Sequence, residues 1–219
     1  MIGIIIENNH LCPEISKSSI MSSNVVNTIG HHVCKSGNKE YLLKNAPFYS
    51  VCTPETEDGK EPFLGNGYYL WDYNLETAHW WGNSHYKGDY SILSYPLTLS
   101  GDNFLDLVGS RQDMENFKKL VDKVRSKPGC EAFGISKCIL TLEKLNSEDG
   151  FGGIFDYKVI RAVDITMNRA SEIYDFASKR DGTTNLNPKI LICFKDKNDI
   201  PLHQAEVVYD KDRRPYYGY

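Results

Sequence analysis

Short strand-like segments at irregular intervals are the feature that most constrains the fold of this chain of 219 residues. Apolar and β-branched runs of this kind occupy residues 25–36, 68–71, 90–99, 190–194 and 205–210. They do not alternate regularly with helical segments, so the sequence disfavours a doubly wound parallel sheet. The pattern predicts a mixed α+β fold, and the length suits a single domain over residues 1–219.

The amino-terminal residues MIGIIIENNH contain a short apolar run without a basic segment before it. We therefore expect a first strand here rather than a secretory signal. The sequence has no run near the roughly 20 apolar residues that cross a bilayer. Its six cysteines form no Cys-x-x-Cys pair, and we interpret them as reduced thiols. These features predict a cytoplasmic protein with no membrane partner.

The charge of the chain bears on its partners. Lysine and arginine number 25 against 29 aspartates and glutamates, which gives a net charge of −4. This balance provides no basic surface for a phosphate backbone, so a nucleic-acid partner is disfavoured. His79 and His85 have no carboxylate or cysteine at metal-ligand spacing. We interpret them as surface or packing residues and predict no metal.

Helical patterns are clearest in residues 111–127, where apolar side chains recur at helical spacing and Pro128 follows. Residues 38–46 predict a shorter helix that begins at Asn38. Its apolar side chains are Tyr41, Leu42 and Leu43. Residues 169–180 also predict a helix or a helical turn. Residues 132–145 fit a helix or a strand, and the sequence leaves that choice open.

The stretch FLGNGYYLWDYNLETAHWW, residues 63–81, combines a tight turn with many aromatic rings. Gly65 and Gly67 permit backbone conformations that a β-carbon would obstruct, which predicts a turn before the strand at 68–71. Asp72 or Asn74 then caps a helix, and Asn83 is its expected end. The apolar residues of this helix are Leu75, Ala78 and Trp81.

Three strand-borne residues follow one another in chain order: His32, Tyr69 and Glu206. The chain resembles the ADP-ribosyltransferase superfamily in three segments: GNGYYLWDYNLETAHWW, AEVVYD and, more weakly, GHHVCKSG. The branch in question is that of diphtheria toxin and poly(ADP-ribose) polymerase. Its members share a histidine, a tyrosine and a glutamate on three strands of a split β-sheet fold. The chain departs from the family in having Val33 where a glycine follows the histidine.

The resemblance implies an α+β fold with a split β-sheet core and flanking helices, in which a helical segment around residues 100–150 is an insertion. It implies a mono-ADP-ribosyltransferase that uses NAD⁺ as co-substrate and no metal, and small stand-alone members of the family are often toxins or effectors. Such an enzyme moves ADP-ribose to a macromolecular acceptor, a protein in the first instance, and releases nicotinamide.

The resemblance also implies roles for individual residues. Glu206 would bind a hydroxyl of the nicotinamide ribose and stabilise the positive charge that develops when the glycosidic bond breaks. Tyr69 would stack on the nicotinamide ring, and His32 would hold the adenine-side ribose. The ligand-binding residues would be His32, Val33, Gly67, Tyr68 and Tyr69. Val33 would contribute its peptide groups, and the Gly67 turn would bring the backbone close to the ligand.

Other functions remain open at this point. NAD⁺ hydrolysis without an acceptor would use the same residues. Transfer of an RNA 2′-phosphate to NAD⁺ would require a basic groove, which the net charge of −4 disfavours. A catalytically silent NAD⁺-binding module is favoured by the missing glycine after His32. An unrelated α+β interaction domain would follow if His32, Tyr69 and Glu206 lay far apart.

Overall fold

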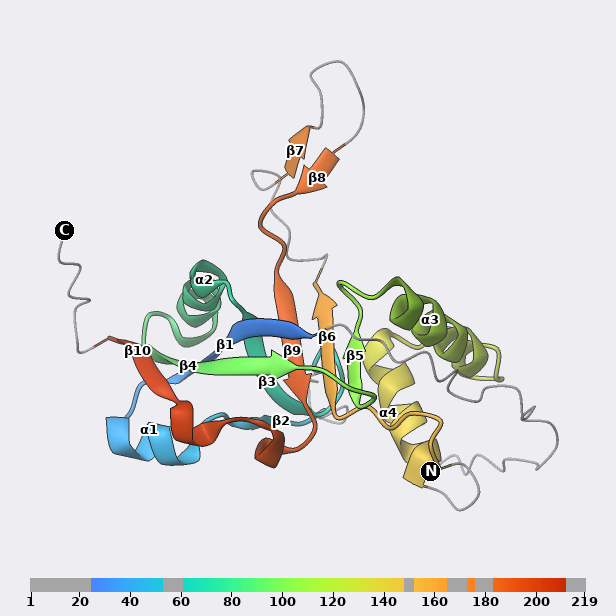
Figure 1. The fold of residues 1–219 in the computed structure, drawn as a ribbon, viewed down its shortest axis with the longest axis horizontal. Helices are drawn as coiled ribbons and strands as arrows, with labels where there is room; N and C mark the ends of the chain where they lie inside the picture. Colours follow the sequence, from blue (N-terminus) through green and yellow to red (C-terminus); the bar gives the residue numbers. More distant parts are fainter. Residues whose placement is uncertain (1–24, 53–60, 148–151, 165–172, 176–182, 212–219) are drawn as a thin grey trace.

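A computed structural model describes residues 25–52, 61–147, 152–164, 173–175 and 183–211 (Figure 1). The strand expected at the amino terminus lies outside these residues, as does most of the helix expected at 169–180. No helix among the described residues is long and apolar enough to cross a membrane. The five cysteines in these ranges are free thiols: Cys34, Cys52, Cys130, Cys138 and Cys193.

An eight-stranded sheet forms the centre of the described part of the chain (Figure 1). Its order is β10-β4-β1-β3-β9-β6-β5, and the short strand β2 pairs with β3. The strands are β1 (Val26–Lys35), β2 (Tyr49–Ser50), β3 (Gly67–Asp72), β4 (Tyr90–Leu99), β5 (Phe104–Asp106), β6 (Val159–Val163), β9 (Ile190–Phe194) and β10 (Glu206–Asp210). β5 and β6 are parallel, and the other pairs are antiparallel. The predicted mixed α+β class is thereby confirmed.

Helices and turns cover both faces of this sheet, which explains why its central strands are apolar on both sides. The helices are α1 (Lys39–Asn45), α2 (Leu75–Tyr86), α3 (Arg111–Arg125) and α4 (Ile135–Ser147). Side chains of α2, α3 and α4 share one core with Trp71 and Leu191 of the sheet. A second core joins α1 and the turn before β10 to Leu70 and Ile192. Adjacent residues of β3 and β9 therefore enter different cores.

The helix that the sequence left undecided at 132–145 is α4, which packs against α3 beside the edge strand β5 (Figure 1). The helix expected at 111–127 is α3, and Ser110 caps it by accepting a hydrogen bond from the N–H of Asp113. Its apolar stripe is buried at Phe117, Leu120, Val121 and Val124. Both helices lie in the segment around residues 100–150 that the sequence analysis marked as helical.

The structure corrects two details of the predicted helices. Tyr41 of α1 is 56% exposed, so Leu42 is the residue that anchors this helix to the core. Helix α2 does not end at Asn83 but continues to Tyr86, and Lys87 closes it with φ +52°. Gly82 is instead required for packing, because a β-carbon there would overlap the ring of Tyr90.

The structure decides between the two expected caps of α2 and corrects the segment at 173–175. Asn74 caps α2 by accepting a hydrogen bond from the N–H of Thr77, 2.9 Å away, whereas Asp72 pairs with an arginine. The prediction of a helix or helical turn at 169–180 is wrong for residues 173–175, which are the described part of this segment. Residues Ile173–Asp175 form strand β7, which pairs antiparallel with β8 (Thr183–Asn185). β-Branched residues in both segments favour this pairing.

Candidate functional site

A split between β1 and β3 creates the candidate site. These strands pair at only two positions, Gly30 with Asp72 and His31 with Trp71. β1 then continues to Lys35 against β4, and on the edge of β3 that faces β1 the first half of β3 pairs with β2 instead. The edge of β1 after His31 therefore faces a gap rather than a neighbouring strand.

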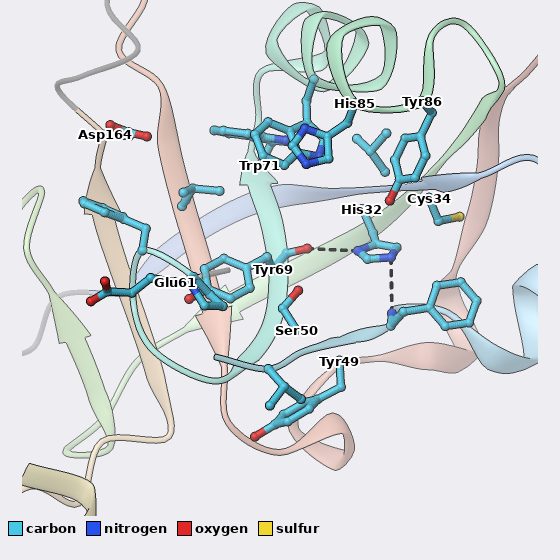
Figure 2. Close-up of a pocket in the computed structure, with 17 residues that line it drawn as sticks. His32, Cys34, Tyr49, Ser50, Glu61, Tyr69, Trp71, His85, Tyr86 and Asp164 are labelled. Carbon is cyan, nitrogen blue, oxygen red and sulfur yellow. Dashed lines mark hydrogen bonds between the residues drawn. The ribbon is translucent and has the colours of Figure 1, made fainter. Parts of the chain in front are cut away.

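The imidazole of His32 bridges this gap. Its Nδ1 lies 3.0 Å from the carbonyl oxygen of Tyr69, and its Nε2 lies 3.2 Å from the amide nitrogen of Phe48 (Figure 2). Because a carbonyl only accepts and an amide N–H only donates, Nδ1 carries the proton and the ring is neutral. Burial lowers the pKa of His32 to about 4, which keeps the ring neutral at physiological pH. His32 thus ties β1 to β3 and to the segment before β2.

A pocket of about 660 Å³ opens at the split (Figure 2). Its walls come from the second half of β1, the segment around β2, β3 and the chain just before it, the carboxyl-terminal part of α2 and the ends of β6 and β9. The described lining residues are His32, Val33, Cys34, Phe48, Tyr49, Ser50, Val51, Glu61, Pro62, Phe63, Tyr69, Trp71, Trp81, His85, Tyr86, Asp164 and Leu191. The volume lies within the range of pockets that hold small molecules and cofactors.

Aromatic rings dominate this lining. The ring of Trp81 lies 5.8 Å from that of Trp71 and stacks on His85 at 3.9 Å with an interplanar angle of 17°. His85, which was expected at the surface or in packing, lines the pocket, and this place was not predicted. Its spacing of four residues from Trp81 puts both rings on one side of α2, and this is the signal that would have found it.

Tyr69 is a fixed part of the pocket wall. Its hydroxyl donates to the carbonyl of Gly65 at 2.6 Å and accepts from the N–H of Leu64 at 2.8 Å. Burial raises the pKa of the Tyr69 hydroxyl, so it stays protonated. Lys195 secures the same turn, because its Nζ lies 2.8 Å from the carbonyl oxygen of Leu64 and 3.0 Å from that of Asn66. The turn adopts φ +75° at Gly65, a conformation that favours glycine.

Gly67 and Tyr68 do not belong to the described lining of the pocket. A β-carbon at Gly67 would lie 2.5 Å from Sγ of Cys193 and 2.7 Å from the carbonyl oxygen of Phe194. The close backbone approach that requires this glycine is therefore an approach to β9. The ring of Tyr68 packs against the second core, and it also meets the ring of the exposed Tyr49 edge-on at 4.9 Å.

The peptide groups of Val33 face the gap. The carbonyl of Ile29 accepts from the N–H of Tyr73 at the end of β3, which shows that Ile29 directs its peptide groups toward β3. Successive residues of a strand alternate in this direction, so His31 and Val33 share it. At Val33 the pairing with β3 has already ended. One N–H donor and one C=O acceptor are thus directed at the pocket.

Glu206 lies apart from the other two residues of the predicted triple. It is the first residue of β10, it is exposed, and it pairs with Ser94 of β4. Ser94 in turn pairs with His31, so two strand spacings, roughly 10 Å, separate Glu206 from β1. The structure brings His32 and Tyr69 together in one pocket, and Glu206 is not among the described residues that line it.

Two other acidic residues are present in the described lining, and the sequence analysis singled out neither. Glu61 is exposed at the rim, while Asp164 is only 4% exposed and directly follows β6. The N–H of Asp164 donates to the carbonyl of Lys189 at 2.8 Å, which extends the pairing of β6 with β9 by one position. A charged residue directly after an apolar strand is the available sequence signal for such a position.

A buried ionic cluster supports the sheet below the pocket. Nε of Arg161 lies 2.6 Å from Oδ2 of Asp72, and its guanidinium also reaches Oδ1 of Asp106 at 3.1 Å. Thr28 donates a further hydrogen bond to Asp72. These contacts join β1, β3, β5 and β6. Because each charge has a partner, we interpret the cluster as structural.

No group of three or more histidines, cysteines or acidic residues suited to a metal occurs in the part of the chain that the structure describes. Compared with models of protein families, with curated proteins and with solved structures, the chain matches none. We therefore infer a function from the geometry of the pocket and from the sequence motifs.

Proposed function

We propose that the chain binds NAD⁺ in the pocket at the β1–β3 split and transfers its ADP-ribose to a macromolecular acceptor, a protein in the first instance. The observation that carries this proposal is the meeting of His32, Val33 and Tyr69 around one aromatic pocket. Two of the three residues of the family-like triple thus share a site, although 37 positions separate them in the sequence.

The proposed ligand fits the groups that the pocket presents. The carboxamide of nicotinamide has one carbonyl acceptor and an amino donor, which match the N–H and C=O of Val33. The flat pyridinium ring suits the aromatic lining formed by Tyr69, Trp71 and Trp81. A valine can serve here as well as a glycine because the contact uses main-chain atoms.

His32 contributes to this site through the backbone. Both of its ring nitrogens already bind peptide groups, at 3.0 and 3.2 Å. We therefore propose that the main role of His32 is to hold the split open and to fix Tyr69, and not to bind a ribose hydroxyl. Its role is that of a positioning residue.

A silent NAD⁺-binding module is the second candidate, and the position of Glu206 outside the described lining favours it. Such a module would bind the ligand and leave its glycosidic bond intact. An NAD⁺ glycohydrolase would differ from the transferase only in using water as the acceptor.

Two measurements separate these candidates. Calorimetry with NAD⁺, nicotinamide and nicotinic acid tests the site, and we expect the amide to bind more tightly than the acid, since the acid lacks the amino donor. Nicotinamide release is then measured with and without cell lysate. Release that rises with lysate supports a transferase, equal release supports a glycohydrolase, and binding without release supports the silent module. Absence of both binding and release would refute the proposal.

A further inference from the structure

We infer that Lys195 and Glu143 are positioning residues through which helix α4 fixes the ring of Tyr69 in the pocket wall. This inference rests on the proposed function, since it assigns residues that support the binding of NAD⁺. Neither residue belongs to the described lining of the pocket. Both act through the turn at residues 64–66, which directly precedes β3.

The ammonium group of Lys195 is fully engaged. Its Nζ lies 2.8 Å from the carbonyl oxygen of Leu64, 3.0 Å from that of Asn66 and 2.7 Å from Oε1 of Glu143. An ammonium group has three N–H donors, so these three oxygen atoms use its whole capacity. The Lys195 side chain is only 16% exposed, and water therefore competes little for its donors. One side chain thus joins the end of β9, the turn and α4.

Helix α4 meets the turn with one of its faces. Ile139 and Glu143 are four residues apart, so they lie on the same side of the helix. A β-carbon at Gly65 would lie 3.3 Å from Cγ2 of Ile139 and 3.5 Å from Nζ of Lys195. The backbone of the turn therefore packs closely against both α4 and the lysine. An apolar contact and an ion pair together fix the turn to this helix.

The turn in turn supports two walls of the pocket (Figure 2). The hydroxyl of Tyr69 donates to the carbonyl of Gly65 at 2.6 Å and accepts from the N–H of Leu64 at 2.8 Å. The side-chain oxygen of Asn66 accepts from the N–H of Cys52, 2.7 Å away, in the segment that follows β2. The ring of Tyr69 and the segment around β2 are therefore held by the same turn.

The orientation of Tyr69 matters for the ligand because a flat ring stacks well only on a face that is held in the matching plane. Hydrogen bonds at the phenol hydroxyl restrict the ring before the ligand arrives, so binding costs less conformational entropy. Loss of Lys195 releases the turn, and Tyr69 then loses its anchor. The affinity for NAD⁺ should fall although no residue that lines the pocket has changed.

The test is a double-mutant cycle of Lys195→Met and Tyr69→Phe, in which calorimetry measures the affinity for NAD⁺. Phenylalanine keeps the ring and removes the hydroxyl that contacts the turn. We expect Lys195→Met to weaken NAD⁺ binding roughly fivefold to tenfold in the wild type, but less than about twofold in the Tyr69→Phe background. A merely structural role of Lys195 would lower the affinity equally in both backgrounds.

Two further variants complete this cycle. Lys118→Met is the matched control, because it also removes a lysine from an ion pair, but this pair is exposed on α3. Its affinity for NAD⁺ should equal that of the wild type. Glu143→Gln tests the connection to α4, since it leaves the carbonyl contacts of Lys195 in place and removes the charge of its partner. We expect binding about twofold to threefold weaker, and wild-type affinity would overturn the role of α4.

Urea unfolding without ligand provides the same cycle independently of NAD⁺. Lys195→Met and Tyr69→Phe weaken the same turn, so the double variant should lose less in its urea midpoint than the sum of the two single losses. If Lys195→Met does not fold, the cycle of Glu143→Gln with Tyr69→Phe decides by the same comparisons.

The outcomes distinguish the inference from the proposed function. Equal losses of NAD⁺ affinity in the two backgrounds would overturn the inference and leave the proposed function standing. A wild type that does not bind NAD⁺ would refute the proposed function, and the urea midpoints would then decide the inference. Additive losses would overturn the positioning of Tyr69 by Lys195, and non-additive losses would support it.

Discussion

The buried imidazole of His32 leads to a quantitative prediction about pH. The ring is 7% exposed, and its pKa falls from 6.5 to about 4 in the folded protein because burial disfavours the charged form. Below pH 6.5 the unfolded chain binds a proton at this position that the folded chain does not bind. The free energy of unfolding therefore decreases as the pH falls from 6.5 to 4, and it is unaffected by His32 above this window.

The size of the effect follows from the two pKa values. The difference between a pKa of 6.5 and one of about 4 corresponds to about 3 kcal/mol in the free energy of unfolding, of which about 2 kcal/mol is already lost at pH 5. The assay is urea unfolding of the wild type and of His32→Gln between pH 8 and pH 4. Glutamine retains a donor and an acceptor for the two peptide groups but does not titrate, so stability should decrease less steeply with falling pH.

A matched control is available in the exposed His203, which lies in the turn before β10. His203→Gln also removes one imidazole, but it leaves the β1–β3 split unchanged, and its stability should follow the wild type with pH. Parallel curves for the wild type and His32→Gln would refute the argument that His32 is buried and neutral. They would also contradict the assignment of Nδ1 as the donor and Nε2 as the acceptor in its two hydrogen bonds.

Three further predictions concern other parts of the molecule. Gly67→Ala should lower the free energy of unfolding by roughly 1–3 kcal/mol, because the new methyl group would lie 2.5 Å from a sulfur on β9. The control Gly152→Ala has open space around it and should leave the free energy of unfolding unchanged. Thermal unfolding measures both variants. Arg161→Met leaves two buried carboxylates unpaired and should cost about 3–5 kcal/mol in urea unfolding, against less than about 1 kcal/mol for Arg111→Met in an exposed pair. His85→Ala removes the stacked ring and should weaken NAD⁺ binding severalfold by calorimetry, if the pocket binds NAD⁺ as proposed.

The position of Glu206 has a consequence for sequence comparison. The segment AEVVYD does form a strand, as its period-two pattern predicts, but this strand lies at the sheet edge beyond β4. The strand that flanks β3 on the side away from β1 is instead β9, whose sequence ILICF has no acidic residue. A motif match can therefore identify a strand correctly without placing its side chain in the site.

Local sequence determined much of this protein, because the physical causes act over a few residues. Asn38 caps α1 with a hydrogen bond to the N–H of Tyr41, and the apolar stripe of α3 repeats with the helical period. The strands at 90–99 and 190–194 were predictable from their β-branched and apolar composition. Their irregular spacing along the chain excluded a doubly wound sheet. Each of these features depends on neighbours in the sequence.

Only the tertiary structure decided which of these elements meet. The gap after the His31–Trp71 pair depends on β2 occupying the position beside β3, and the glycine at position 82 inside α2 is required by its close packing against Tyr90. Strand pairing also brings Asp164 into the pocket and leaves Glu206 two strands away from β1. Strand order and register arise from packing among segments far apart in the chain, and residue types within one segment do not encode them.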